Sequence, residues 1–144
     1  NGNHMVSYEI CVYNDGGADG DYDLYDEPIF DDDISVIAAT YSCDTDPGST
    51  FTGEAPAGGW LLLDNETISP GVKQCCTIDI EVNINIAPGS SGDNVVTECG
   101  TAIPGMPSPG EALYNESTLD LNNDGTKDEM DAACEDVEYA LRGA

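Results

Sequence analysis

The chain has 144 residues, of which 29 are Asp or Glu and 3 are Lys or Arg, so its formal net charge at pH 7 is −26. This length fits one domain with a core of useful size. Nucleic-acid backbones and anionic lipid surfaces repel such a chain, because binding phosphate takes a basic patch. The composition therefore excludes nucleic acid as a partner, and the lack of a long apolar run argues against membrane insertion.

The cysteine content points to disulfides. The six cysteines lie at positions 11, 43, 75, 76, 99 and 134. None of their spacings resembles a zinc site, and the single histidine, His4, falls in residues 1–5, which we interpret as a cloning remnant. An even number of cysteines in a small acidic domain indicates disulfides in an oxidising compartment. We therefore expect residues 6–144 to be one extracellular domain, excised from a larger secreted chain.

The first third of the chain contains two predicted strands. The segment 6–14 is β-branched and aromatic and ends in a turn sequence, which predicts the first strand. Residues 19–33 hold eight acids interspersed with apolar residues, so we expect an ordered acidic loop or a short edge strand. The segment 34–42 predicts another strand. A long loop rich in Gly, Pro, Ser and Thr should then follow through Gly59.

The middle of the chain supplies the core. Trp60 and the three leucines after it return to the core, and a turn is expected at residues 64–65. From Cys76 to Ile86, apolar and polar residues alternate over eleven positions. This period predicts the central strand of a half-exposed antiparallel sheet. Cys75 and Cys76 must then point to opposite faces, so their partners lie on different sides.

The last third is read as two strands, a loop and a helix. A short strand is expected at 94–99, a proline-rich loop at 104–109 and a further strand at 111–119. Apolar residues then recur at helical spacing from Met130 to Leu141, with Asp128 as a plausible N-cap. This pattern predicts a short C-terminal helix. The competing interpretation is a final strand over residues 134–139.

Residues 120–131 have the spacing of a calcium-binding loop. The expected ligands are Asp120, Asn122, Asp124, the carbonyl group of Thr126, Asp128 and Asp131. Gly125 allows the sharp turn between them, because it can adopt positive φ. Position 12 is Asp rather than Glu and position 8 is Lys127, which favours a lone, dockerin-like or adhesin-like loop over half of a sensor pair. The sequence thus predicts Ca²⁺ as the cofactor.

A second cluster of acids precedes the second predicted strand. Asp15, Asp19, Asp21 and Asp23 could form another calcium site or a solvated acidic surface. The sequence leaves these two interpretations open.

Several segments together resemble a known family. They are 8–17, 22–26, 59–60 with 68–71, 113–117 and 131–134. They look like the conserved repeat domains of large bacterial surface proteins, in which such segments mark successive strands of an Ig-like sandwich. The resemblance implies an all-β, antiparallel Ig-like β-sandwich of about seven strands. It also implies a Cys99–Cys134 bridge, which would leave Cys43 to pair with one of the adjacent cysteines and Cys11 with the other.

Catalysis has little support in the sequence, since no histidine is available for a triad and acids are too abundant to single out a pair. We therefore expect a protein that is not an enzyme. The first hypothesis is a calcium-stiffened structural or adhesive module of the cell surface, whose partners are calcium, neighbouring repeat domains and surface proteins or glycans. The alternative is a calcium-dependent glycan-binding module.

Overall fold

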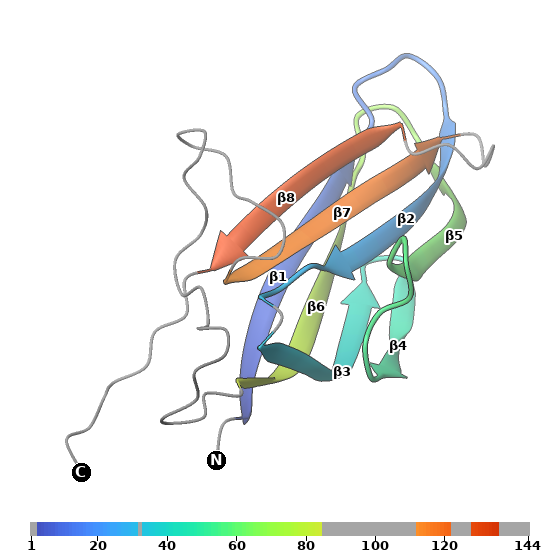
Figure 1. The fold of residues 1–144 in the computed structure, drawn as a ribbon. Coiled ribbons are helices and arrows are strands. Elements are labelled where there is room, and N and C mark those ends of the chain that lie inside the picture. Colours follow the sequence, from blue (N-terminus) through green and yellow to red (C-terminus); the bar gives the residue numbers. More distant parts are fainter. Residues whose placement is uncertain (1–2, 32, 85–111, 122–127, 136–144) are drawn as a thin grey trace, which may run out of the picture.

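The computed structural model describes residues 3–31, 33–84, 112–121 and 128–135, in which every regular element is a β-strand. The strands are β1 (Asn3–Tyr13), β2 (Gly20–Pro28), β3 (Ile34–Cys43), β4 (Asp46–Thr52), β5 (Trp60–Ile68), β6 (Lys73–Ile84), β7 (Leu113–Leu121) and β8 (Glu129–Glu135). They form two antiparallel sheets with the strand orders β1-β6-β3-β4 and β5-β2-β7-β8 (Figure 1). The predicted all-β antiparallel sandwich is confirmed, with eight described strands. No membrane-spanning helix is found in the described part of the chain.

The centre of the first sheet is β6, as its alternation predicted. Its inward side chains Cys76, Ile78, Ile80 and Val82 are almost completely buried, and β1 and β3 pair with it on either side. Burying one such aliphatic side chain contributes about 1.5–3 kcal/mol to stability. The outward residues of β6 are polar, so this strand fixes which face of the sheet becomes core.

Two hydrogen bonds between the sheets show which strands face each other. The hydroxyl group of Tyr8 in β1 donates to the backbone oxygen of Leu113 in β7. The hydroxyl group of Tyr22 in β2 donates to Oε1 of Gln74 in β6. Because β1 thus faces β7 and β6 faces β2, β8 extends beyond β1, which is the last described strand of the opposite sheet.

Aromatic rings pack between the sheets on the side of β4 and β5. Phe51 of β4 stacks on Trp60 of β5, with ring centroids 5.1 Å apart, and on Tyr41 of β3, at 5.5 Å. Trp60 is buried, which confirms its predicted place in the core.

Two disulfides join β6 to both of its neighbours. Cys11 pairs with Cys75 on β1–β6, and Cys43 pairs with Cys76 on β3–β6, in each case from directly opposite positions. Cys76 is buried, whereas Cys75 lies on the other face of β6, so the predicted pairing and the opposite orientation of the two cysteines are both confirmed. Cys134 is also disulfide-bonded, and its partner lies outside the described residues.

The acidic segment 19–33 was expected to be a loop or an edge strand, and this is wrong for β2. This strand lies between β5 and β7 in the middle of its sheet. Alternation explains the difference, because Tyr22 and Leu24 face the core while Asp21 lies on the exposed side. Asp26 is the exception, since it is an inward carboxyl group held by hydrogen bonds.

The predicted long loop before Gly59 contains a strand, β4. Pro47 is tolerated there because β4, among the described strands, lies at the edge of its sheet and pairs with β3 alone. The predicted turn at residues 64–65 is instead an irregularity within β5. Asn65 adopts a φ of 52° there, next to a register shift in the pairing with β2. Turn-forming residues thus made a β-bulge rather than a chain reversal.

The predicted C-terminal helix is wrong for the described residues up to 135. β8 pairs with β7 from Glu129 to Glu135, so the hydrogen bonds that a helix would form locally are made between strands. The competing prediction of a final strand gave the correct element type but placed its start too late. Asp128 is not a helix cap, because its Oδ2 accepts a hydrogen bond from the Leu121 amide at the end of a hairpin.

Other expectations concern the termini and the interval between β6 and β7. β1 begins at Asn3, so it includes His4 and Met5 of the segment interpreted as a cloning remnant. The predicted strand at 94–99 and the loop at 104–109 lie outside the described residues.

Candidate metal site

The predicted calcium loop lies at the tip of the β7–β8 hairpin. The amide of Asp128 donates to the Leu119 carbonyl group at 2.7 Å, and the Leu121 amide donates to Asp128 Oδ2 at 2.8 Å. These bonds bring the two ends of the loop together, with Asp120 and Asp128 at its base. Asn122, Asp124 and Thr126 lie outside the described residues.

A second carboxylate meets Asp120 at this base. Asp23 of β2 lies directly opposite Asp120 of β7, and both side chains are almost completely buried. Asp23 accepts a hydrogen bond from the backbone amide of Asn65 at 2.6 Å, which partly stabilises its negative charge. Like charges in directly opposed positions destabilise a sheet, and their burial adds to this cost. A cation beside the pair would offset both effects.

The titration of Tyr25 reflects this concentration of charge. Burial raises the pKa of its phenol group. The negative charges of Asp23, Asp120 and Asp64 raise that pKa further. Three carboxylates from β2, β7 and β5 therefore act on one side chain at the base of the loop.

The sequence identified these acids, but it grouped Asp23 with Asp15, Asp19 and Asp21. In the structure Asp23 lies opposite Asp120 instead. Asp21 accepts a hydrogen bond from the Thr67 hydroxyl group at 2.8 Å, and Asp15 and Asp19 lie exposed before β2. In the described part of the chain, no three of these carboxylates come within 4.8 Å of one another. The pairing of β2 with β7, which brings Asp23 to Asp120, joins segments about a hundred residues apart in the chain and has no local sequence pattern.

Asp131, predicted as the last ligand, lies away from the base of the loop. It is the third residue after Asp128, in β8 opposite Ser117, and its Oδ1 accepts a hydrogen bond from the Ala132 amide. Three residues of extended strand span about 10 Å. Calcium ligands lie within about 2.6 Å of the ion, so this register favours Asp120 over Asp131 as a ligand at the base of the loop. The prediction placed Asp131 in the site because it occupies position 12 of the calcium-loop spacing.

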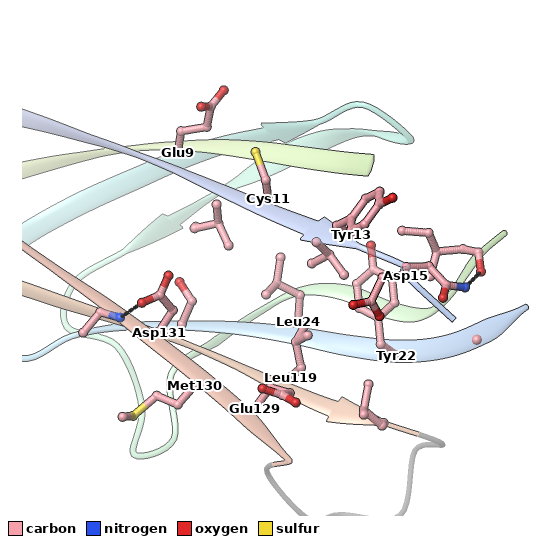
Figure 2. A pocket seen from close by; sticks show the side chains of 18 of the residues that line it. Glu9, Cys11, Tyr13, Asp15, Tyr22, Leu24, Leu119, Glu129, Met130 and Asp131 are labelled. Atoms are coloured by element: carbon pink, nitrogen blue, oxygen red, sulfur yellow. Dashed lines mark hydrogen bonds between the residues drawn. The ribbon is translucent and has the colours of Figure 1, made fainter. Parts of the chain in front are cut away.

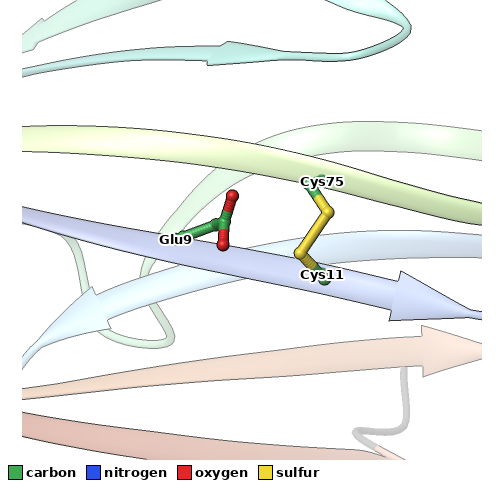
Figure 3. A group of neighbouring side chains, drawn as sticks. All are labelled: Glu9, Cys11 and Cys75. Atoms are coloured by element: carbon green, nitrogen blue, oxygen red, sulfur yellow. A yellow bond between two sulfur atoms is a disulfide. The ribbon is translucent and has the colours of Figure 1, made fainter.

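One other cluster combines acid and sulfur, but its chemistry does not suit a metal. Glu9 lies beside the disulfide between Cys11 and Cys75 (Figure 3). Metal ions bind the thiolate form of cysteine, and these two sulfur atoms are bonded to each other.

A buried polar group lies on the inner face of the second sheet. Asn115 Nδ2 donates to Asp26 Oδ1 at 2.6 Å, and the Ser117 hydroxyl group donates to the same oxygen at 2.9 Å. The pKa of Asp26 is raised to about 6. Burial is the largest cause and the charge of Glu27 adds to it, whereas the two hydrogen bonds lower the pKa. Asp26 Oδ2 and Asn115 Oδ1 are buried without a hydrogen-bond partner. The sequence grouped Asp26 only with the other acids and missed this environment.

No family model, curated protein or solved structure matches this chain.

Proposed function

We propose that this chain is a calcium-binding, disulfide-stapled extracellular module with a structural or adhesive role in a larger secreted or cell-surface protein. The observation that carries the proposal is the buried pair Asp23 and Asp120 at the base of a loop with calcium-ligand spacing. A cation beside two opposed, buried carboxylates lowers the cost of burying their charges. Calcium suits them because it prefers several oxygen ligands.

The ligand set of this proposal differs in one residue from the one that spacing alone suggests. Asp120 and Asp128 bind from the two ends of the loop, and Asn122, Asp124 and the Thr126 carbonyl group bind from within it. Asp131 is left out, because the strand register carries it away from Asp120. Asp23 adds negative charge beside the ion from the neighbouring strand.

The extracellular part of the proposal rests on the disulfides. Cys11–Cys75, Cys43–Cys76 and the further disulfide at Cys134 indicate a chain that matures in an oxidising environment. Extracellular fluids also hold enough calcium for a weak site, because extracellular modules bind it with a Kd of about 10⁻⁴–10⁻³ M. Location at a cell surface and contact with neighbouring repeats follow from the same proposal.

Thermal unfolding in calcium and in chelator tests the metal. Calcium at a hundredfold excess over its Kd adds about 2.7 kcal/mol, which for a domain of this size raises the Tm by about 5–10 °C. Magnesium at the same concentration is the control for general charge screening. Equal melting curves in calcium, magnesium and chelator would reject the proposal.

Two variants locate the site. Asp124→Ala removes a proposed ligand and should weaken calcium binding at least tenfold in a calorimetric titration. Asp131→Ala removes the same charge from a residue outside the proposed ligand set and should change the affinity less than threefold. If Asp131→Ala abolishes binding, the loop closes as a helix-terminated calcium loop and the ligand set proposed here is wrong.

A further inference from the structure

A cleft opens between the two sheets where β8 extends beyond β1. It has a volume of about 620 Å³ and is lined by residues of β1, β2, β7 and β8 (Figure 2). Among the described strands, β1 lies at the edge of one sheet and β8 lies at the edge of the other. In the described part of the chain, this offset leaves the outer edge of β1, opposite the inner face of β8, without a paired strand.

The lining of the cleft combines an apolar interior with an acidic margin. Ile10, Val12, Leu24 and Leu119 form its apolar part. The carboxylates among the described residues that line it are those of Glu9, Asp15, Asp21, Glu129 and Asp131. No Lys or Arg is among the described residues that line it. An occupant should therefore carry positive charge on an extended, partly apolar frame.

The acids of β8 are oriented toward this space. Glu129 and Asp131 are paired with Leu119 and Ser117, whose side chains lie on the inner face of the sheet. Figure 2 shows both carboxylates on the cleft side of β8, with Met130 pointing away. Residues two apart on a strand are separated by about 7 Å, so these carboxylates match alternate residues of a facing strand.

The cleft also contains a buried hydrogen-bond acceptor, Oδ1 of Asn115. Asn115 lines the cleft, is 3% exposed, and its Oδ1 has no hydrogen-bond partner. The amide nitrogen of the same side chain is already engaged with Asp26. A guanidinium or ammonium group in the cleft could donate to the unsatisfied oxygen.

We propose that this cleft binds an extended basic peptide of a partner protein, which adds as a strand to the outer edge of β1. Backbone hydrogen bonds to β1 hold the peptide, and alternate Arg or Lys side chains point toward Glu129 and Asp131. The proposal does not depend on calcium, since Glu129 is no part of the metal site.

The occupant is a different protein rather than a second copy of this chain. The whole sequence contains only Lys73, Lys127 and Arg142 as cations, and no two of them alternate along one strand. Two copies would also bring together net charges of −26 each. A basic partner instead gains from the same field, which speeds its association at low salt.

The probe is a blocked nine-residue peptide in which arginine and threonine alternate. It is titrated into the 15N-labelled protein in chelator, at low and at high salt. Its control has the same composition, but its arginines are consecutive. We expect the alternating peptide to bind at least fivefold more tightly and to shift the amide resonances of β1 and β8.

Two charge-matched variants separate specific docking from general attraction. Glu129→Gln removes a carboxylate inside the cleft and should weaken binding about threefold to fivefold, as expected for one partly exposed ion pair. Glu81→Gln removes one from the outer face of β6, which does not line the cleft, and should leave the affinity unchanged. Equal affinity for both peptides, an equal effect of both variants, or no binding at millimolar peptide would each overturn the proposal.

Discussion

The carboxyl group of Asp26 opposes folding at neutral pH. Its pKa is raised from 3.8 to about 6, chiefly because burial disfavours the charged form. Below pH 3.8 the group is protonated in both the folded and the unfolded chain, so its ionisation does not affect the free energy of unfolding there. As the pH rises through 6 it ionises inside the core. The free energy of unfolding falls by about 3 kcal/mol over this interval, since one pKa unit corresponds to about 1.4 kcal/mol.

Asp26→Asn should remove this pH dependence. The amide keeps an oxygen that can accept from Asn115 and Ser117 and never ionises. We expect the variant to be more stable than the parent at pH 7.5 by up to about 3 kcal/mol, and to gain little at pH 3.5. Urea unfolding at both values measures this. Asp19→Asn, an exposed position, is the control for the charge change, and an equal gain there would show that net charge alone is responsible.

Gly59 is required where the chain passes the backbone of β2. It has a φ of 95°, and a Cβ atom added there would lie 2.7 Å from the Asp26 carbonyl oxygen. Gly53 also has a positive φ, 79°, but no atom lies within 4 Å of an added Cβ. Both glycines therefore adopt a positive φ, but only Gly59 lacks room for a side-chain methyl group.

Gly59→Ala should therefore destabilise the protein more than Gly53→Ala. The unfavourable φ costs about 1 kcal/mol or more at either position. The backbone contact at Gly59 should add at least another 1 kcal/mol, because close packing leaves little room to move. Denaturant unfolding of both variants gives the difference. Equal losses would mean that the strand relaxes around the new methyl group.

At the scale of the elements, the two cross-strand disulfides differ in burial and in loop length. Cys11–Cys75 closes a separation of 64 residues on the exposed face, and Cys43–Cys76 closes 33 residues with Cys76 in the core. Chain entropy alone gives each about 4 kcal/mol and favours the longer loop by only about 0.6 kcal/mol. Removing the sulfur atoms at the inner position also leaves a cavity.

We accordingly expect Cys43→Ala with Cys76→Ala to cost more stability than Cys11→Ala with Cys75→Ala. The cavity term should exceed the small advantage of the longer loop. Urea unfolding of the two double variants decides this. A larger loss for the exposed pair would show that loop length outweighs packing.

The strands with one apolar and one polar face were predictable from sequence. The alternation of β6 gave its central position, its buried face and the opposite directions of Cys75 and Cys76. β4 was missed because it is an edge strand whose Pro, Gly and Ser content suits a loop equally well. β8 was read as a helix because its apolar residues also fit a helical period, and pairing with β7 overrode that local preference.

The candidate metal site was predictable only in part, for the same physical reason. The spacing within 120–131 is local, so it could be read directly from the chain. The facing of Asp23 and Asp120 depends on the pairing of β2 with β7, which is not local. The position of Asp131 away from the base of the loop likewise depends on the extended conformation of β8.

At the scale of the whole molecule, the net charge of −26 makes stability sensitive to salt. At 0.01 M ionic strength the Debye length is about 30 Å, comparable to the size of the domain, and it falls to about 3 Å at 1 M. The Tm should therefore rise steeply between 10 and about 500 mM NaCl, because repulsion between surface carboxylates is screened. Differential scanning calorimetry checks this. A flat response would mean that bound cations already neutralise the carboxylates.

The Cys11–Cys75 bond also determines how this domain would carry tension. Suppose that tension is applied to β1 at one end and to the chain after β8 at the other. The force then passes from β1 to β6 through the Cys11–Cys75 disulfide. The 64-residue interval between the two cysteines is then bypassed. At about 3.5 Å per residue, roughly 220 Å of contour length stays unreleased under load. A tether made of such domains would be short and stiff in oxidising surroundings, and a reductant would turn it into a compliant spring.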